Sequence, residues 1–267
     1  MIDSIVSSVW LNNHLGDPDL VILDASQDAK QNGFLNIRIS GARFFDIKND
    51  FSDATSNFPN TFPSVHQFEI SCRNLGINNS SKIVVYDKMG IFSSPRVWWL
   101  FKSMGHDSVF VLDGGFPDWV NNNFDTEIPK KESYAIGDFK ASLHSNNVRF
   151  FDFMKGNIVS NNALVIDARS ADRFNGVVSE SRVGLRSGHI PNSINLHYQL
   201  VLTNGKFKPK KELVSVFSEI VSDKPLIFSC GSGITACIIL LACDSFLDND
   251  LSVYDGSWTE WGQLSDV

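Results

Sequence analysis

Four short motifs recur in the same order along the chain, and this internal repeat restricts the fold more than any other feature. The second member of each pair follows the first by 142 to 151 positions. The pairs are residues 20–26 and 164–170, 39–44 and 190–195, 82–87 and 224–229, and 112–119 and 254–261. Four matches in one order indicate a tandem duplication. The chain must therefore fold as two similar units.

Each copy alternates short apolar runs with helical stretches. The predicted strands are 20–23, 42–45, 83–86 and 108–112 in the first copy, and 163–166, 193–196, 226–229 and 251–254 in the second. The predicted helices are 64–75 and 95–104, then 209–221 and 235–246. This alternation is typical of βα units. It predicts an α/β fold with two tandem domains, each a mainly parallel sheet flanked by helices on both faces.

The domain boundaries follow from a polar stretch in the middle of the chain. We expect an N-terminal domain over residues 1–122, a linker over 123–138 and a C-terminal domain over 139–267. The linker is rich in polar residues and contains Pro129, which is a composition typical of a connection between domains.

Composition argues against several classes of partner. The 267 residues are 43% hydrophobic and 20% charged, with a net charge of −7. An acidic chain is a poor binder of nucleic acid or of an anionic membrane. No run approaches the length of a membrane span, and residues 1–16 lack the pattern of a signal peptide. Four cysteines without paired metal-ligand spacing predict no disulfide framework, no metal and no cofactor, so we expect a cytoplasmic protein.

The stretch that carries chemistry is the second copy's third strand with the loop after it. An apolar run ends at Cys230, and Gly231, Ser232, Gly233, Ile234 and Thr235 follow before an apolar helix. A strand, a tight loop and a helix start place several inward backbone N–H groups and the positive end of the helix dipole around the cysteine. Such a site favours the reactive thiolate over the alternative of a buried structural thiol.

The repeat provides an internal control for this loop. When the copies are aligned without gaps at an offset of 142 positions, Cys230 falls opposite Lys88. Residues 231–233 fall opposite Met89, Gly90 and Ile91. The first copy therefore lacks the nucleophile, and we expect it to contribute stability and one wall of a cleft.

Several motifs together resemble the tandem-domain sulfurtransferases, which comprise the rhodaneses and the 3-mercaptopyruvate sulfurtransferases. The motifs are residues 94–99, 112–115, 188–191, 230–235 and 255–261. The resemblance covers nearly the whole chain and implies sulfur transfer through a Cys230 persulfide, without a cofactor. The implied partners are a small-molecule sulfur donor and an acceptor that is a small thiol, cyanide or a thioredoxin-like protein.

The residues after the cysteine favour one donor. Family members that prefer thiosulfate usually carry basic residues there, whereas this loop continues with the uncharged residues 231–233. It therefore resembles the 3-mercaptopyruvate subgroup. Arg173 and Arg182 match the positions at which this subgroup binds the donor, and guanidinium groups suit a carboxylate beside a carbonyl.

Three alternatives remain beside this interpretation. The protein could be a thiosulfate sulfurtransferase, or it could use the fold as a sulfur carrier or interaction module. Phosphate chemistry is disfavoured, since a Cys-x5-Arg motif would need arginine at position 236, which is alanine.

The resemblance also implies a relay of serine, histidine and aspartate that polarises the reactants. Ser232 matches the serine and Asp46 matches the aspartate, but Asn60 occupies the position of the expected histidine. Asparagine can form hydrogen bonds but cannot exchange a proton near neutral pH. His66, six residues further on, could replace it only after a rearrangement of the loop.

Overall fold

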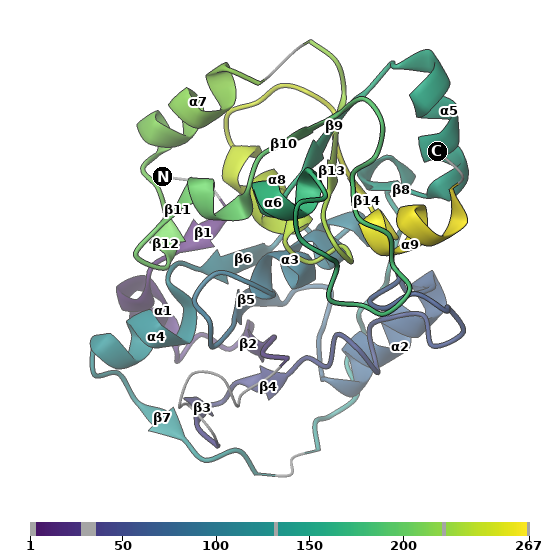
Figure 1. The fold of residues 1–267 in the computed structure, drawn as a ribbon. Coiled ribbons are helices and arrows are strands. Elements are labelled where there is room, and N and C mark those ends of the chain that lie inside the picture. Colours follow the sequence, from purple (N-terminus) through teal and green to yellow (C-terminus); the bar gives the residue numbers. More distant parts are fainter. Residues whose placement is uncertain (1–3, 28–35, 131–132, 221–222, 266–267) are drawn as a thin grey trace.

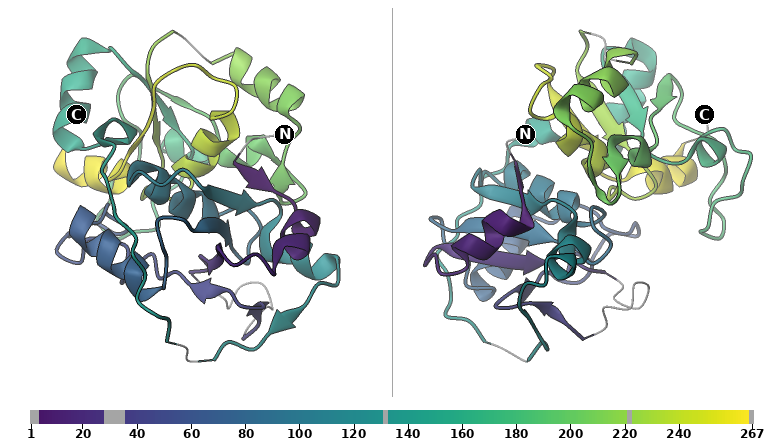
Figure 2. Two further views of the ribbon diagram at one scale, coloured as in Figure 1. Left: turned by 180° about the vertical axis from the view of Figure 1, so that it is seen from behind. Right: turned by 90° about the vertical axis from the view of Figure 1, so that its left-hand side faces the viewer.

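The chain folds into two similar α/β units, as the repeat predicts. The computed structural model describes residues 4–27, 36–130, 133–220 and 223–265. Each unit contains a five-stranded sheet in which every neighbouring pair of strands is parallel. Figure 2 shows the units as two lobes, the N-terminal one coloured purple through blue to teal and the C-terminal one teal-green to yellow.

The two sheets have the same strand order. The first runs β1-β6-β5-β2-β4 and the second runs β8-β14-β13-β9-β10 (Figure 1). Their strands are β1 (Ile5–Val6), β2 (Leu20–Asp24), β4 (Arg43–Phe44), β5 (Lys82–Tyr86), β6 (Val109–Leu112), β8 (Val148–Arg149), β9 (Leu164–Asp167), β10 (Ser193–Asn195), β13 (Leu226–Ser229) and β14 (Leu251–Tyr254). This matching order confirms the predicted fold class.

Helices cover both faces of the sheets. They are α1 (Ser8–His14), α2 (Val65–Asn74), α3 (Ser94–Ser103), α4 (Gly115–Asn121), α5 (Phe151–Ser160), α6 (Ala171–Phe174), α7 (Lys210–Ser218), α8 (Ala236–Cys243) and α9 (Ser257–Leu264). The helix predicted over 209–221 begins one residue later, and position 221 lies outside the described residues. None of the helices in the described stretches is long and apolar enough to cross a membrane.

The largest hydrophobic cluster runs through both domains. Helix α3 of the first lobe packs against α8 of the second, and every residue of α8 is buried. A helix that is apolar all round belongs inside a protein, which explains why α8 lies between the two lobes. Two smaller clusters, one in each domain, stabilise the remaining layers.

Two edge strands were not predicted. Strands β1 and β8 each contain two residues, and they pair with β6 and β14 at the edges of their sheets. A two-residue strand is too short to show an alternating pattern, so only the folded sheet reveals it.

The connection between the domains stays with the N-terminal lobe. Strand β7 (Thr126–Glu127) pairs antiparallel with β3 (Arg38–Ile39). Phe139, at the expected start of the C-terminal domain, instead packs edge-on against Phe68 and Phe101 of the first lobe. The Phe139 ring, at the end of the polar linker, thus anchors the connection to the N-terminal domain.

Two aspartates at the Asp-Gly turns bind across the domain boundary. Asp255 Oδ2 accepts a hydrogen bond from Phe62 N (2.6 Å), and Asp113 Oδ1 accepts one from Phe207 N (3.0 Å). Aspartates that open tight turns with glycine commonly hold backbone N–H groups. Here each repeat uses its turn aspartate to hold the backbone of the other.

Arg96, on α3, makes several hydrogen bonds at this boundary. It is fully buried, and its Nη2 donates to Asp255 Oδ1 (2.8 Å) and to Asn60 O (2.6 Å). Its Nη1 donates to Gly233 O (3.3 Å), and its guanidinium lies 4.5 Å from the centre of the Trp99 ring. One buried cation therefore joins the N-terminal domain to the cysteine loop.

Replacing Arg96 with methionine should lower the free energy of unfolding by about 3–5 kcal/mol, because the buried Asp255 carboxylate loses its counter-charge. Denaturant unfolding measures this loss. Lys155→Met provides the matched control, since Lys155 pairs with Asp152 on the surface and its loss should cost about 1 kcal/mol or less. Equal effects of the two substitutions would contradict a special role for the buried pair.

Candidate functional site

Cys230 lies at the floor of a cavity between the two domains. The cavity has a volume of about 710 Å³, and Cys230 itself is only 2% exposed. Cys230 N donates to Ser257 Oγ (3.2 Å), and Cys230 O accepts from Trp258 N (3.0 Å). Both partners belong to α9, so the cysteine backbone is held by the helix that follows the Asp-Gly turn.

The loop after Cys230 presents a row of unused donors. The backbone N–H groups of Gly231, Ser232, Gly233, Ile234 and Thr235 make no hydrogen bond within the described part of the chain. Consecutive free N–H groups at a helix start form an anion-binding concavity. This arrangement can hold a thiolate, or the outer sulfur of a persulfide, without a cationic side chain.

Gly233 is required by the shape of this loop. Its φ of +76° lies in the left-handed region, which favours glycine. A Cβ at this position would lie 2.9 Å from both Arg96 Nη1 and Asp255 O. Any side chain here would therefore push against the contact between the domains.

The equivalent loop of the first copy has its donors occupied. Asp87 Oδ2 accepts hydrogen bonds from the backbone N–H groups of Phe92, Ser93 and Ser94, each at 2.9 Å. Its other oxygen accepts from Met89 N at 2.9 Å. The repeat therefore explains why only one loop is available for chemistry, because the N-terminal copy fills its own anion site with a carboxylate.

Ser232 and Asn60 lie together, as the resemblance implies. Asn60 Nδ2 donates to Ser232 Oγ (3.1 Å) and to Ser232 O (3.3 Å), and both residues line the cavity. Asn60 has a φ of +60°, a conformation that asparagine tolerates well. A hydroxyl that accepts from Asn60 keeps its own proton for another partner.

Asp46 and His66 are placed elsewhere. The Asp46 carboxylate accepts hydrogen bonds from Asn49 Nδ2 (2.8 Å) and from Lys48 N (3.1 Å). Asp46 and the exposed His66 are absent from the described lining of the cavity. The role of Asp46 therefore stays a prediction without a contact to support it.

The acidic side chain that does line the cavity is Asp53. It accepts hydrogen bonds from the hydroxyl (2.7 Å) and the backbone N–H (2.8 Å) of Thr55, which lower the pKa of its carboxyl group. Asp53 thus places a carboxylate of the N-terminal domain in the same cavity as the reactive loop.

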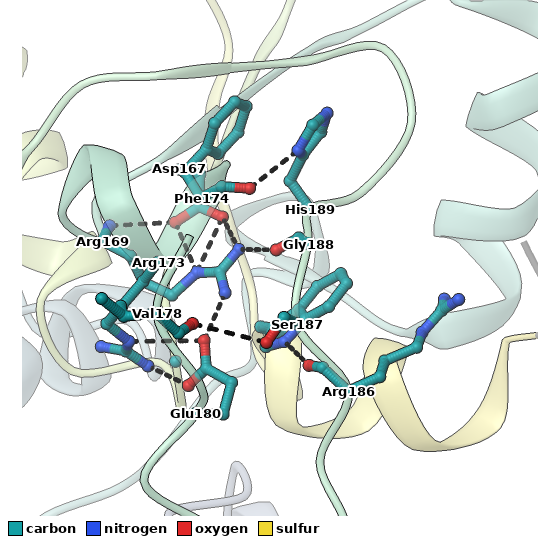
Figure 3. A network of polar contacts seen from close by, with 12 residues as sticks. Asp167, Arg169, Arg173, Phe174, Val178, Glu180, Arg186, Ser187, Gly188 and His189 are labelled. Atoms are coloured by element: carbon teal, nitrogen blue, oxygen red, sulfur yellow. Dashed lines mark hydrogen bonds and ion pairs between the residues drawn. The ribbon is translucent and has the colours of Figure 1, made fainter. Parts of the chain in front are cut away.

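Arg173, at the cavity rim, belongs to a balanced charge network (Figure 3). Its Nη2 donates to Glu180 Oε2 (2.5 Å), and Glu180 Oε1 accepts from Arg169 Nη1 (2.7 Å). Arg169 Nη2 also donates to Asp167 Oδ2 (2.6 Å). Two cations and two anions therefore cancel. A Cβ on Gly231 would lie 3.2 Å from Arg173 Nη2, so this guanidinium lies directly against the loop.

Arg182 reaches the same cavity with a different partner. Its Nη1 donates to Thr259 Oγ1 (2.8 Å), and no carboxylate pairs with it among the described residues. The two arginines expected from the sequence thus line one cavity with Cys230, one with its charge compensated and one without.

The other cysteines have structural positions. Cys237 is fully buried and its Sγ lies 3.4 Å from Gly233 O. Burial raises the pKa of this thiol to about 12, so it stays protonated at neutral pH. Cys72 and Cys243 are also unpaired and buried. No cluster of ligands suited to a metal ion occurs in the described part of the chain.

Four residues that shape the site were not assigned by sequence reasoning. They are Asp53, Arg96, Glu180 and Thr259, and each acts through a contact described above. The motif at residues 94–99 marked the region of Arg96, and the motif at 255–261 contains Thr259, but neither motif shows what these side chains touch.

Comparison with known proteins identifies the repeated module. The Rhodanese-like domain family matches the chain twice, over residues 7–122 and 151–264. The two matches cover the two sheets apart from the edge strands β1 and β8, and the second match includes the Cys230 loop.

Individual relatives match over nearly the full length. The 3-mercaptopyruvate sulfurtransferase of Escherichia coli K12 is 37% identical, covering 98% of this chain and 96% of the relative. The thiosulfate sulfurtransferase of Gallus gallus is also 37% identical, covering 97% and 93%. The crystal structure of SseA from Escherichia coli has a TM-score of 0.85 at 35% identity, covering 96% of this chain and 98% of that one. The chain therefore belongs to the rhodanese family and is a two-domain sulfurtransferase.

Proposed function

We propose that the protein takes sulfur from 3-mercaptopyruvate and passes it to a thiophilic acceptor through a persulfide on Cys230. The observation that carries this proposal is the row of free backbone N–H groups at residues 231–235, in a cavity that also contains Arg173 and Arg182. The backbone N–H groups can hold anionic sulfur, and the arginines can bind the donor's carboxylate.

The first step forms a sulfur–sulfur bond at the cavity floor. The Cys230 thiolate attacks the donor's sulfur, and the carbon–sulfur bond of the donor breaks. The electron pair of that bond passes to carbon as the enolate of pyruvate, which takes up one proton and leaves as pyruvate. The loop N–H groups stabilise the negative charge on sulfur throughout this step.

The second step returns the enzyme to its starting state. An acceptor thiolate or cyanide attacks the outer sulfur of the persulfide, forming a new bond to that sulfur. The sulfur–sulfur bond breaks, and its electron pair regenerates the Cys230 thiolate. An acceptor thiol must project into the cavity to do this, since Cys230 is nearly inaccessible. A small thiol or a protruding cysteine of a thioredoxin-like protein meets that requirement.

Charge in the cavity favours a monoanionic donor. Glu180 compensates Arg173, whereas Arg182 has no acidic partner among the described residues. Lys48 and Asp53 also line the cavity, and their opposite charges offset each other. The one uncompensated guanidinium that remains matches one carboxylate better than it matches a dianion such as thiosulfate. Because relatives named for either donor are equally similar to the chain, this local charge balance is the argument for 3-mercaptopyruvate.

The chemistry needs no metal or organic cofactor, because the thiolate and the loop amides carry both steps. The unpaired state of the four cysteines suits a reducing compartment. A cytoplasmic location therefore stays our prediction.

Incubation with 3-mercaptopyruvate should increase the intact mass of the protein by one sulfur atom. Cys230→Ser should show no increase, while Cys237→Ser should behave as wild type because the Cys237 thiol is fully buried. Intact-protein mass spectrometry after removal of excess donor makes the measurement. A wild-type protein that gains no mass would refute the proposed mechanism.

The donor preference provides a separate test. With one acceptor held at fixed concentration, kcat/KM for 3-mercaptopyruvate should exceed that for thiosulfate by about tenfold or more, the range of one charge-assisted hydrogen bond. Steady-state assays of pyruvate and of the sulfur product measure the two rates. A preference for thiosulfate would favour the alternative activity.

Asn60→His should restore a proton-exchanging group beside Ser232. We expect a higher turnover with 3-mercaptopyruvate below about pH 6.5, where an unperturbed imidazole is protonated, and a new titration in the pH–rate profile. Asn60→Gln, which cannot titrate, is the control. Identical profiles for the histidine and glutamine variants would show that the transfer does not use a proton from this position.

A further inference from the structure

We propose that Thr259 is a positioning residue that sets where Arg182 lies relative to Cys230. This inference rests on the proposed function, because it assigns Arg182 to the donor's carboxylate. Thr259 is 1% exposed and lies in α9, the helix whose first residues hold the backbone of Cys230.

The Thr259 hydroxyl links the two parts of the site directly. It donates its single hydrogen to Gly231 O (2.5 Å) and accepts a hydrogen bond from Arg182 Nη1 (2.8 Å). A hydroxyl can donate only one hydrogen bond. The two hydrogen bonds therefore run in one direction, from Arg182 to the Thr259 hydroxyl and from that hydroxyl to Gly231 O. The residue next to the nucleophile and the donor-binding arginine are thus one hydroxyl apart.

Arg182 depends on this contact more than Arg173 depends on any one partner. Arg173 is held by two hydrogen bonds to Glu180 (2.5 and 3.3 Å). In the described structure Arg182 makes its one side-chain hydrogen bond to Thr259, and it lies between two exposed residues, Ser181 and Val183. A long side chain on an exposed loop has many rotamers, so the hydroxyl selects the one that faces the cavity.

Loss of the hydroxyl should leave the cysteine loop in place. Gly231 O also accepts from Thr259 N (2.9 Å), and this backbone bond does not depend on the side chain. Valine has the shape of threonine without the oxygen, so Thr259→Val removes one acceptor for Arg182 and retains the packing of α9.

The test compares Thr259→Val with Thr259→Ser, which keeps the hydroxyl. Thr259→Val should raise KM for 3-mercaptopyruvate about five- to tenfold, the range of a single hydrogen bond, and Thr259→Ser should stay within about twofold of wild type. Alkylation of Cys230 by neutral iodoacetamide, which has no carboxylate for Arg182, should proceed at the wild-type rate in both variants.

A double-mutant cycle separates an effect through Arg182 from an effect through the loop. The rate of sulfur uptake by Cys230 is followed by mass in single turnovers, which remain measurable in slow variants. Thr259→Val should have no further effect in an Arg182→Ala background. It should keep its full effect in an Arg173→Ala background, because Thr259 does not contact Arg173.

Two results would overturn the inference: a wild-type KM for Thr259→Val, or an equal loss with and without Arg182. If Thr259→Val fails to fold, Thr259→Ala removes the same oxygen and is judged by the same cycle. A wild-type protein that takes no sulfur from 3-mercaptopyruvate refutes the proposed function as well. Sulfur uptake by wild type together with no effect of Thr259→Val refutes the role of Thr259 alone.

Discussion

The buried guanidinium of Arg96 is the interaction on which the reactive site depends. It comes from the N-terminal domain, yet it binds Asp255 and Gly233 O of the C-terminal domain as well as Asn60 O of its own. A cation without access to water needs such partners, so their geometry is tightly constrained. The cysteine loop consequently takes its shape from both domains, and neither copy of the module could form this site alone.

The two copies treat the same backbone feature in opposite ways. In the first, the Asp87 carboxylate occupies the N–H groups of residues 92–94. In the second, Ser229 stands at the position of Asp87, and the loop N–H groups of residues 231–235 remain available beside Cys230. An anion site filled by the protein's own carboxylate is stable and inert. An unfilled one can instead stabilise sulfur anions during transfer, so one duplication produced both a structural domain and a reactive one.

Electrostatic balance around the cavity limits what the site can attract. Arg169 and Arg173 are offset by Asp167 and Glu180, which leaves Arg182 as a cation held only by the Thr259 hydroxyl. A neutral hydroxyl orients a guanidinium without reducing its charge, whereas a carboxylate does both. Arg173 is therefore oriented and neutralised by Glu180, whereas Arg182 is oriented by Thr259 and keeps its charge.

The sequence by itself determined the duplication, the α/β fold, the loop with Cys230 and the two arginines, because each is encoded in a local pattern of apolar runs, glycines and motif residues. Only the tertiary structure decided which carboxylate lines the cavity, Asp53 rather than Asp46, and which side chains hold the loop. Arg96 and Asp255 lie 159 positions apart, and Arg182 and Thr259 lie 77 apart. The first contact arises from how the two domains dock, and the second from how the C-terminal domain folds on itself. No local sequence pattern encodes either contact.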